Sequence, residues 1–250
     1  MAVAQDIMGL GAVELARRVR ARELSPVEVV EAALARVARV NGPLNAVVTL
    51  NQGVLDQARD LEQRLARGEY PGPLAGLPVG IKDITPVAGL RTTYGSPLYA
   101  DHVPTEDALV VQRLRAAGAL VLGKTNTPEF AAGGNTWNDV FGWTRNPWHP
   151  ERSAGGSTGG GAAALATGMI AVAEGTDLGG SLRIPASFCG VVGLRPSIGL
   201  VPTSPSDWAW DTLAVTGPMA RTAEDVALAL QAMAGPSPWA PLGLPVAGRA

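Results

Sequence analysis

Residues 155–180 read GGSTGGGAAALATGMIAVAEGTDLGG, and this stretch holds nine of the 31 glycines in the chain. Its spacing predicts a helix over 158–168, followed by a buried strand from Ile170 to Ala173. Clustered glycines allow positive φ angles, and such backbone can present several N–H groups to one anion. The stretch therefore predicts a helix–strand unit with a backbone anion site, suited to a phosphate or to the oxyanion of a reaction.

The segments on either side alternate helices with short apolar strands. A capping box at Ser25-Pro26-Val27-Glu28 opens a predicted helix and places proline at its first position. Further helices are predicted over 12–21, 53–67 and 106–117 and from Thr222, and strands over 46–50, 78–81, 119–122 and 191–194. This alternation indicates an α/β fold with a mixed, largely parallel central sheet flanked by helices.

Composition argues against several classes of function. The 250 residues carry a formal net charge of −2, without the basic excess of a nucleic-acid-binding surface. The single cysteine, Cys189, excludes an internal disulfide framework and fits the reducing cytoplasm. Two histidines, His102 and His149, are too few for most histidine-rich metal sites. The uncharged stretch 153–173 is made mostly of small residues, and the N-terminus does not resemble a signal peptide. We therefore expect a cytoplasmic protein without cofactor, metal, nucleic-acid or membrane partner.

Lysine is rare, because only two of the 20 cationic residues are lysines. Lys82 ends the apolar run LPVGIK, and Lys124 ends ALVLGK, so Lys82 is placed for burial. Burial lowers the pKa of a lysine from its usual value of about 10.4, and a neutral lysine can act as a base. For Lys124 we expect a capping or pairing role near a helix start at Pro128, without chemistry.

Two common motifs match residue by residue, but the secondary structure predicted around them does not fit either motif. Residues 118–125 fit the phosphate-loop pattern G-x-x-x-x-G-K-[ST], yet the four intervening residues are apolar and predict a strand instead of a loop. Residues 155–159 fit the pattern G-x-S-x-G of a nucleophile elbow. That motif needs a preceding strand and a later histidine, whereas RNPWHPERSA contains two prolines and no histidine follows His149.

A serine–lysine hydrolase fits the composition better, because it needs no histidine. Ser181 follows Gly179 and Gly180, where backbone N–H groups can converge on an oxyanion. By capping preference alone, Ser181 would rather be a helix cap, and Lys82 could simply pair with Asp83. Cys189 fits a buried core thiol. Asp177 and Arg183 are expected to brace the glycine-rich turn, and Trp208 and Trp210 to line a pocket mouth.

Taken together, the motifs resemble the amidase signature family of Ser–Ser–Lys amide hydrolases. The matching segments cover nearly all of residues 70–230, in the order in which the family has them. They are GLPVGIKD (76–83), LGKTNTPEF (122–130), GWTRNPWHPERSAGGSTGGGAAALATG (142–168), GTDLGGSLRIPASFCGVVGLRPS (175–197) and GPMARTAEDV (217–226).

The resemblance implies the amidase signature fold and a role for each matching residue. Lys82 matches the catalytic lysine, Ser157 the serine held by a cis peptide bond, and Ser181 the nucleophile. The backbone N–H groups that match the oxyanion hole belong to Leu178, Gly179, Gly180 and Ser181. The implied activity is hydrolysis of the C–N bond of a linear carboxylic acid amide, a small-molecule substrate, through an acyl-enzyme.

Three departures from the family pattern bear on function. Thr158 stands where the family usually has a second serine, and Gly161 where a serine is common. The segment DTLAVTGPMAR (211–221) lacks the Gln-Ile-Gly-Pro of amidotransferase A subunits, which weakens that alternative without excluding it.

Length is the largest departure, since family members typically have a further C-terminal half. We expect an N-terminal helical layer over 1–70, an amidase signature core over 71–235, and a loop over 236–250 that leads to a missing half. The alternative function is a catalytically incompetent fragment. Such a fragment would pair through an exposed sheet edge with its missing half or another chain, or form a homodimer.

Overall fold

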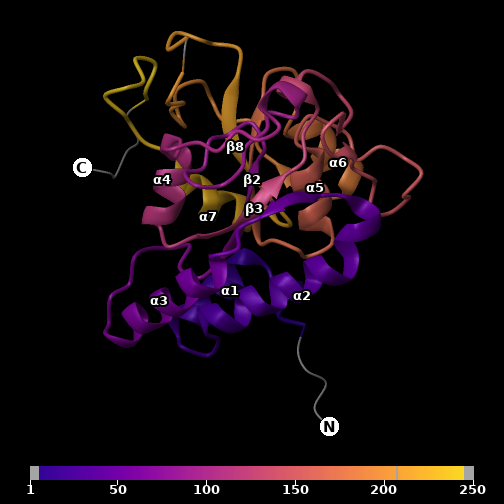
Figure 1. The fold of residues 1–250 in the computed structure, drawn as a ribbon. Coiled ribbons are helices and arrows are strands. Elements are labelled where there is room, and N and C mark those ends of the chain that lie inside the picture. Colours follow the sequence, from indigo (N-terminus) through magenta and orange to yellow (C-terminus); the bar gives the residue numbers. More distant parts are fainter. Residues whose placement is uncertain (1–5, 207, 245–250) are drawn as a thin grey trace.

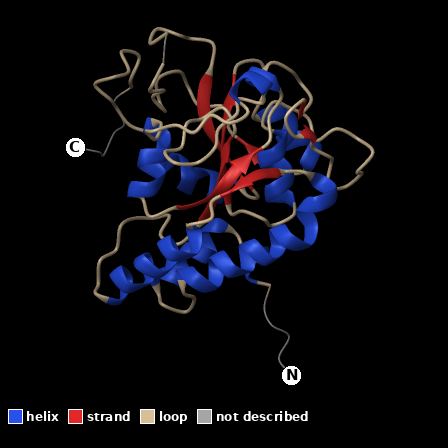
Figure 2. Ribbon diagram, viewed as in Figure 1, coloured by secondary structure: helices blue, strands red, loops and turns tan. Residues whose placement is uncertain are grey.

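The computed structural model describes residues 6–206 and 208–244. Within them, a central six-stranded sheet has the order β1-β3-β2-β6-β8-β7 (Figures 1 and 2). Its strands are β1 (Val47–Leu50), β2 (Pro78–Lys82), β3 (Leu120–Thr125), β6 (Val172–Asp177), β7 (Val192–Gly193) and β8 (Val215–Ala220). A separate two-stranded pair joins β4 (Trp137–Asn138) to β5 (Gly142–Trp143).

The sheet confirms the predicted mixed architecture. β3, β2 and β6 are mutually parallel, whereas β1 and β8 pair antiparallel to their neighbours. Because β7 is antiparallel to β8, it runs in the direction of the three central strands. Most strands therefore point one way, and their carboxyl ends meet at one edge of the sheet.

The strand β8 is absent from the elements expected from sequence. Its sequence VTGPMA contains Gly217 and Pro218, which weaken or interrupt strands. Here β8 lies between β6 and β7 with every residue buried. The strand predicted at 170–173 also differs, because β6 extends to Asp177 and carries the buried Glu174. The longer strand forms because β8 pairs with β6 as far as Asp177.

Helices flank the sheet, as predicted. They are α1 (Ala12–Arg20), α2 (Pro26–Leu44), α3 (Val54–Ala66), α4 (Leu109–Ala116), α5 (Gly159–Ala166), α6 (Arg183–Cys189) and α7 (Ala223–Met233). Short 3-10 turns occupy Ile7–Gly9, Pro97–Tyr99 and Glu129–Ala131. The capping box is present, because the Ser25 hydroxyl accepts the Glu28 N–H and the Glu28 carboxylate accepts the Ser25 N–H.

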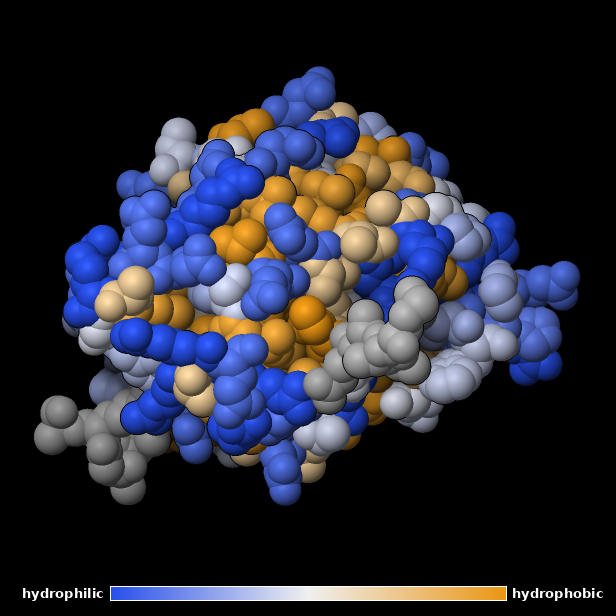
Figure 3. Space-filling model, turned by 90° about the horizontal axis from the view of Figure 1, so that it is seen from below, coloured by the Kyte–Doolittle hydropathy of each residue, from blue (hydrophilic) through white to orange (hydrophobic). Residues whose placement is uncertain are grey.

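The first three long helices form a layer along one side of the sheet, at the bottom of Figure 1. Seen from that side, hydrophilic residues alternate with visible hydrophobic ones (Figure 3). The strand β1, which lies between α2 and α3 in the sequence, forms one edge of the sheet. Of the loop predicted over 236–250, residues 236–244 contain no helix or strand, and residues 245–250 lie outside the described part of the chain.

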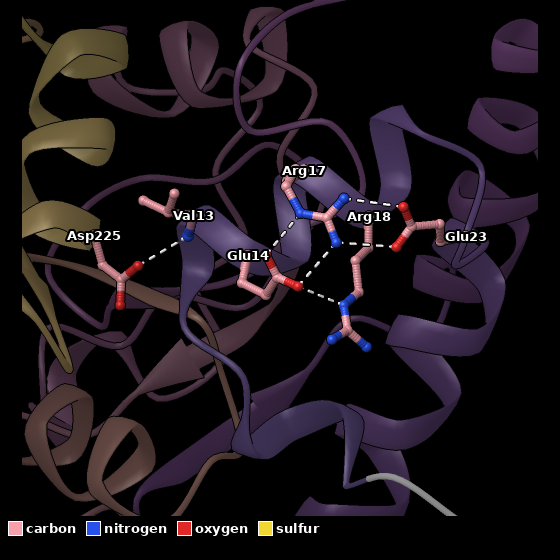
Figure 4. Close-up of polar contacts among 6 residues, drawn as sticks. All are labelled: Val13, Glu14, Arg17, Arg18, Glu23 and Asp225. Carbon is pink, nitrogen blue, oxygen red and sulfur yellow. Dashed lines mark hydrogen bonds and ion pairs between the residues drawn. The ribbon is translucent and has the colours of Figure 1, made fainter.

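A buried carboxylate connects the two ends of the chain. The Asp225 Oδ1 atom, at the start of α7, accepts the Val13 N–H at 2.8 Å, at the start of α1 (Figure 4). On the outer side of α1, Glu14 pairs with Arg17, and Arg17 with Glu23. Those pairs are exposed and contribute little to stability, so α1 is held by its buried apolar face and by the contact with Asp225.

The helix α5 approaches the sheet unusually closely. A Cβ atom at Gly160 would lie 2.2 Å from the backbone nitrogen of Asn126 and 2.7 Å from the carbonyl oxygen of Ala46. Glycine is therefore required there. This contact holds the N-terminal end of α5, and with it Ser157, against the carboxyl ends of the central strands.

No helix in residues 6–206 and 208–244 combines the length and the hydrophobicity that a membrane crossing requires. In the same residues, no group of three or more His, Cys, Asp and Glu side chains is arranged to hold a metal ion.

Candidate active site

The side chain of Lys82 lies at the carboxyl end of β2 and is fully buried. Its Nζ atom donates hydrogen bonds to Ser157 Oγ at 2.7 Å and to Thr176 Oγ1 at 2.9 Å. Strands β2 and β6 supply Lys82 and Thr176, and the segment before α5 supplies Ser157. The alternative pairing of Lys82 with Asp83 is absent, because the Nζ atom contacts these two hydroxyls instead.

Burial lowers the pKa of Lys82 to about 7, although the carboxylates of Glu174 and Asp177 act in the opposite direction. An ordinary lysine has a pKa of about 10.4 and is almost entirely protonated at neutral pH. A large fraction of Lys82 is therefore neutral near pH 7, as a general base requires.

The loop before α5 holds Ser157 in place. The Gly156–Ser157 peptide bond is cis. A Cβ atom at Gly156 would lie 2.8 Å from the backbone nitrogen of Asn135, so no larger residue fits. Thr136 Oγ1 donates to the Gly155 carbonyl at 2.8 Å and accepts the Gly159 N–H at 3.1 Å. Sequence reasoning gave Thr136 no role, because its position in a loop carries no local signal.

A second loop, between β6 and α6, presents Ser181. Asp177, the last residue of β6, orders this loop. Its carboxylate accepts the N–H groups of Gly180 at 2.7 Å and Leu182 at 3.2 Å. Arg183 binds the same carboxylate through two nitrogens, at 2.9 and 3.0 Å. Burial acts to raise the pKa of Asp177, but these donors hold it below its usual value. The expected bracing role of Asp177 and Arg183 is confirmed.

The two serines line one cavity of about 310 Å³. The loops are tied together, because the Thr158 N–H donates to the Ser181 carbonyl at 3.2 Å. Apolar side chains make up much of the remaining wall, among them Ile84, Pro86, Phe130 and Leu178. Trp208 and Trp210, expected at a pocket mouth, are mostly exposed and do not line this cavity, but Trp208 lines a second cavity of about 70 Å³.

The backbone around Ser181 offers several N–H groups. The Gly180 N–H is already bound to the Asp177 carboxylate. Among the described residues, no protein atom accepts the N–H of Gly179 or of Ser181. These two N–H groups are therefore available to a ligand, whereas the Gly180 N–H would have to be shared with Asp177.

The prediction for Lys124 is wrong. Lys124 lies fully buried in β3, where its Nζ donates to the Thr85 carbonyl and to Thr92 Oγ1, and it does not cap the turn after Pro128. Burial lowers the pKa of Lys124 to about 8, against the opposing effect of Asp83. The signal was present in the sequence, since Lys124 ends an apolar run as Lys82 does.

The same strand excludes the phosphate-loop hypothesis. Residues 120–125 are an extended, fully buried strand, so the segment does not wrap around a ligand. Cys189 is buried, as predicted, and burial raises the pKa of its thiol to about 12, which makes it a poor nucleophile.

Comparisons with known proteins identify the family of the chain. Residues 28–247 match the amidase family. Over 234 residues the chain is 47% identical to the A subunit of the glutamyl-tRNA(Gln) amidotransferase of Carboxydothermus hydrogenoformans, covering 93% of this chain and 48% of that protein. Over 241 residues it is 46% identical to an acylamidase of Rhodococcus erythropolis, covering 96% of this chain and 50% of the relative.

Solved structures give the same result. A bacterial aryl acylamidase of the amidase signature enzymes superposes with a TM-score of 0.90 at 36% identity, over 95% of this chain and 50% of that one. The 6-aminohexanoate cyclic dimer hydrolase superposes with a TM-score of 0.87 at 38% identity, over 97% and 50%. The chain thus spans about half the length of these relatives. With most of its length matched, the chain belongs to the amidase signature family.

Proposed function

We propose that this chain carries the base, the relay and the nucleophile of an enzyme that hydrolyses the C–N bond of carboxylic acid amides. The observation that supports it most directly is the buried contact of 2.7 Å between Lys82 Nζ and Ser157 Oγ, beside a cavity that Ser181 also lines. Residues 71–235 would be the catalytic core, with 1–70 as its helical layer.

The first half of the proposed reaction forms an acyl-enzyme. Neutral Lys82 takes the proton of the Ser157 hydroxyl while Ser157 takes that of Ser181. The Ser181 oxygen then attacks the carbonyl carbon of the amide. Negative charge develops on the carbonyl oxygen of the tetrahedral intermediate, and the N–H groups of Gly179 and Ser181 donate to it.

Leu178 and Gly180 are the two remaining candidates for the oxyanion hole, and their N–H groups differ in availability. The Leu178 N–H precedes those of Gly179 and Ser181 in the same turn and is proposed as a further donor. The Gly180 N–H would contribute only by sharing its hydrogen with Asp177. Asp177 thus orients the loop, and the oxyanion is bound by its neighbours.

The second half of the reaction releases both products. The intermediate collapses as its C–N bond breaks, and the relay returns a proton to the departing amine. The acyl group remains on Ser181. Water then attacks this ester with the same relay as its base, the C–O bond to Ser181 breaks, and a carboxylic acid leaves.

Amides with a neutral acyl group suit the cavity, because the residues named as its wall are mainly apolar. The preference for linear amides is the one that the family resemblance implies. A role as an amidotransferase component is the second candidate, favoured by the 47% identity to the A subunit of such an enzyme. Hydrolysis of simple aryl amides by the chain alone favours the amidase. Release of amide nitrogen only in the presence of glutamyl-tRNA favours the amidotransferase. The single, buried Cys189 supports a reducing compartment such as the cytoplasm as the location.

A fluorophosphonate probe tests the nucleophile without any choice of substrate. Attack by Ser181 displaces fluoride and leaves a phosphonylated serine. Wild type should label, and Ser181→Ala should not. Ser187→Ala is a matched control, because Ser187 lies on α6 and is exposed. A folded wild type that does not label would contradict the proposal and favour the catalytically incompetent fragment.

A further inference from the structure

Four ionisable side chains lie buried together where β2, β3 and β6 end. They are the two lysines of the chain, Lys82 and Lys124, and two carboxylates, Asp83 and Glu174. Two positive and two negative groups balance when all are charged, which reduces the cost of burying them. The proposed reaction uses only Lys82, so the other three need a reason to be there.

Glu174 connects the strand of the base to the turn that follows it. On β6, Glu174 lies opposite Ile81 of β2. Its Oε2 atom accepts the backbone N–H of Lys82 at 3.1 Å, and its Oε1 atom accepts the Thr85 hydroxyl at 3.0 Å. Both carboxylate oxygens are thus used to hold the segment that carries Lys82.

Lys124 lies on the same face of the sheet as Glu174. Ile81 is also the neighbour of Lys124 in the pairing of β2 with β3. The Lys124 Nζ donates to the carbonyl of Thr85, the residue whose hydroxyl binds Glu174. Burial raises the pKa of Glu174, while the Thr85 hydroxyl and the charge of Lys124 oppose that effect. Lys124 and Thr85 therefore favour the ionised form of Glu174.

The negative charges that act on Lys82 come from two positions on β6, Glu174 and Asp177. Asp177 is already bound by Arg183 and lies 3.6 Å from Arg195, so its charge is offset. The neighbours of Lys82 Nζ are the uncharged Ser157 and Thr176. Asp83 acts on Lys124. Glu174 also acts on Lys124, and of the two carboxylates that act on Lys82 it has the larger effect.

We propose that Glu174 is a positioning residue for Lys82: its ionised carboxylate holds the end of β2 in place and adds a buried negative charge 3.1 Å from the Lys82 backbone nitrogen. The consequence for activity rests on the proposed function, because it requires Lys82 to be the base. The electrostatic effect itself does not, and it can be measured on the folded chain without a substrate.

The presence of only two lysines makes that measurement direct. Lysine labelled with ¹³C at Cε gives two side-chain signals, which Lys82→Met assigns, and a pH titration of each reports its protonation. We expect the Lys82 midpoint in Glu174→Gln to lie about one pH unit lower than in wild type, because a nearby negative charge favours the ammonium form. Glu174→Asp, which keeps the charge, should return the midpoint toward that of wild type.

Two further variants make the result decisive. Thr85→Val removes the hydroxyl bound to Glu174 and should lower the Lys82 midpoint in the same direction, which covers the case that Glu174→Gln does not fold. Asp225→Asn is the matched control, because Asp225 is a buried carboxylate that binds Val13 and is not among the charges acting on Lys82. Its Lys82 midpoint should equal that of wild type.

The outcomes separate this inference from the proposed function. A Lys82 midpoint that stays at its wild-type value in every folded variant of Glu174 and Thr85 overturns the positioning role. A midpoint that moves, together with an equal shift in the pH dependence of Ser181 labelling, supports both proposals. A midpoint that moves while wild-type Ser181 never labels supports the positioning role and contradicts the proposed hydrolysis.

Discussion

Lys82 Nζ and Ser157 Oγ lie 2.7 Å apart although 75 positions separate the two residues in the sequence. Both side chains are fully buried. The contact forms because β2 ends beside the N-terminal end of α5, which the close approach at Gly160 holds against the sheet. In the proposed relay Ser157 passes the proton of Ser181 to Lys82. The reactivity of Ser181 is therefore expected to depend on Lys82, which is distant from it in the sequence.

Replacing the base should abolish reactivity with little change in fold. Lys82→Met keeps the length of the side chain but removes the amine, so we expect the rate of Ser181 labelling to fall by about 100-fold or more. In wild type the rate should rise with pH through about 7, because burial lowers the pKa of Lys82 to about 7 and the neutral form is the base. Labelling rates between pH 5 and 9 check both points. A wild-type profile that is flat over this range would refute the role of Lys82.

The relay serine makes a separate prediction. Ser157→Ala removes the hydroxyl between Lys82 and the nucleophile, and we expect labelling to slow by about 100-fold. Thr158 follows Ser157, at a position where the family usually has a second serine. Thr158→Ser should therefore leave the rate of labelling close to that of wild type. Equal rates in Ser157→Ala and wild type would show that Lys82 reaches Ser181 by another route.

Two glycine substitutions should change stability in opposite directions. Gly160→Ala places a Cβ atom 2.2 Å from a backbone nitrogen, so we expect a loss of about 3 kcal/mol or more, or failure to fold. Gly134→Ala, in a loop, meets no atom within 4 Å outside its two chain neighbours, and it should stabilise the protein by about 0.4–1 kcal/mol because it restricts the unfolded chain. Urea unfolding followed by circular dichroism measures both. Similar effects of the two changes would contradict the close contact at α5.

The buried contact between Asp225 and Val13 should matter more than the exposed ion pairs beside it. Asp225→Ala leaves the Val13 N–H at the start of α1 without its acceptor, and we expect a cost of about 1–2 kcal/mol. Glu14→Gln, on the outer side of the same helix, should change the free energy of unfolding by less than about 0.5 kcal/mol. The comparison fails if the exposed substitution costs more.

The two buried lysines should make the protein more stable as pH rises from 7 to 9. Burial lowers the pKa of Lys82 to about 7 and that of Lys124 to about 8, both below the value of an unfolded lysine. In this range the unfolded chain therefore binds more protons than the folded one, and the free energy of unfolding increases with pH. Lys124→Met should reduce the slope. An equal slope in that variant would indicate that Lys124 keeps the same protonation on unfolding.

Local sequence determined the features that depend on neighbouring residues. The capping box at Ser25 and Glu28 starts α2 because its hydrogen bonds span only three residues. The apolar runs before Lys82 and Lys124 predicted buried strands, since periodicity reports burial directly. The family motifs, read in order, predicted the architecture, which the fold and the comparisons confirm. The same motifs predicted the residues that are proposed for the site.

Tertiary structure decided what depends on distant partners. The sequence of β8 contains glycine and proline, yet it forms a buried strand because β6 and β7 pair with it on both sides. The hydrogen-bond partners of Lys124 escape local reasoning because Thr85 and Thr92 lie more than thirty positions away. Glu174 is held by Lys82 and Thr85 across a strand pairing that no local pattern reveals. Periodicity predicts which residues are buried, but only the packed sheet determines which buried charges meet.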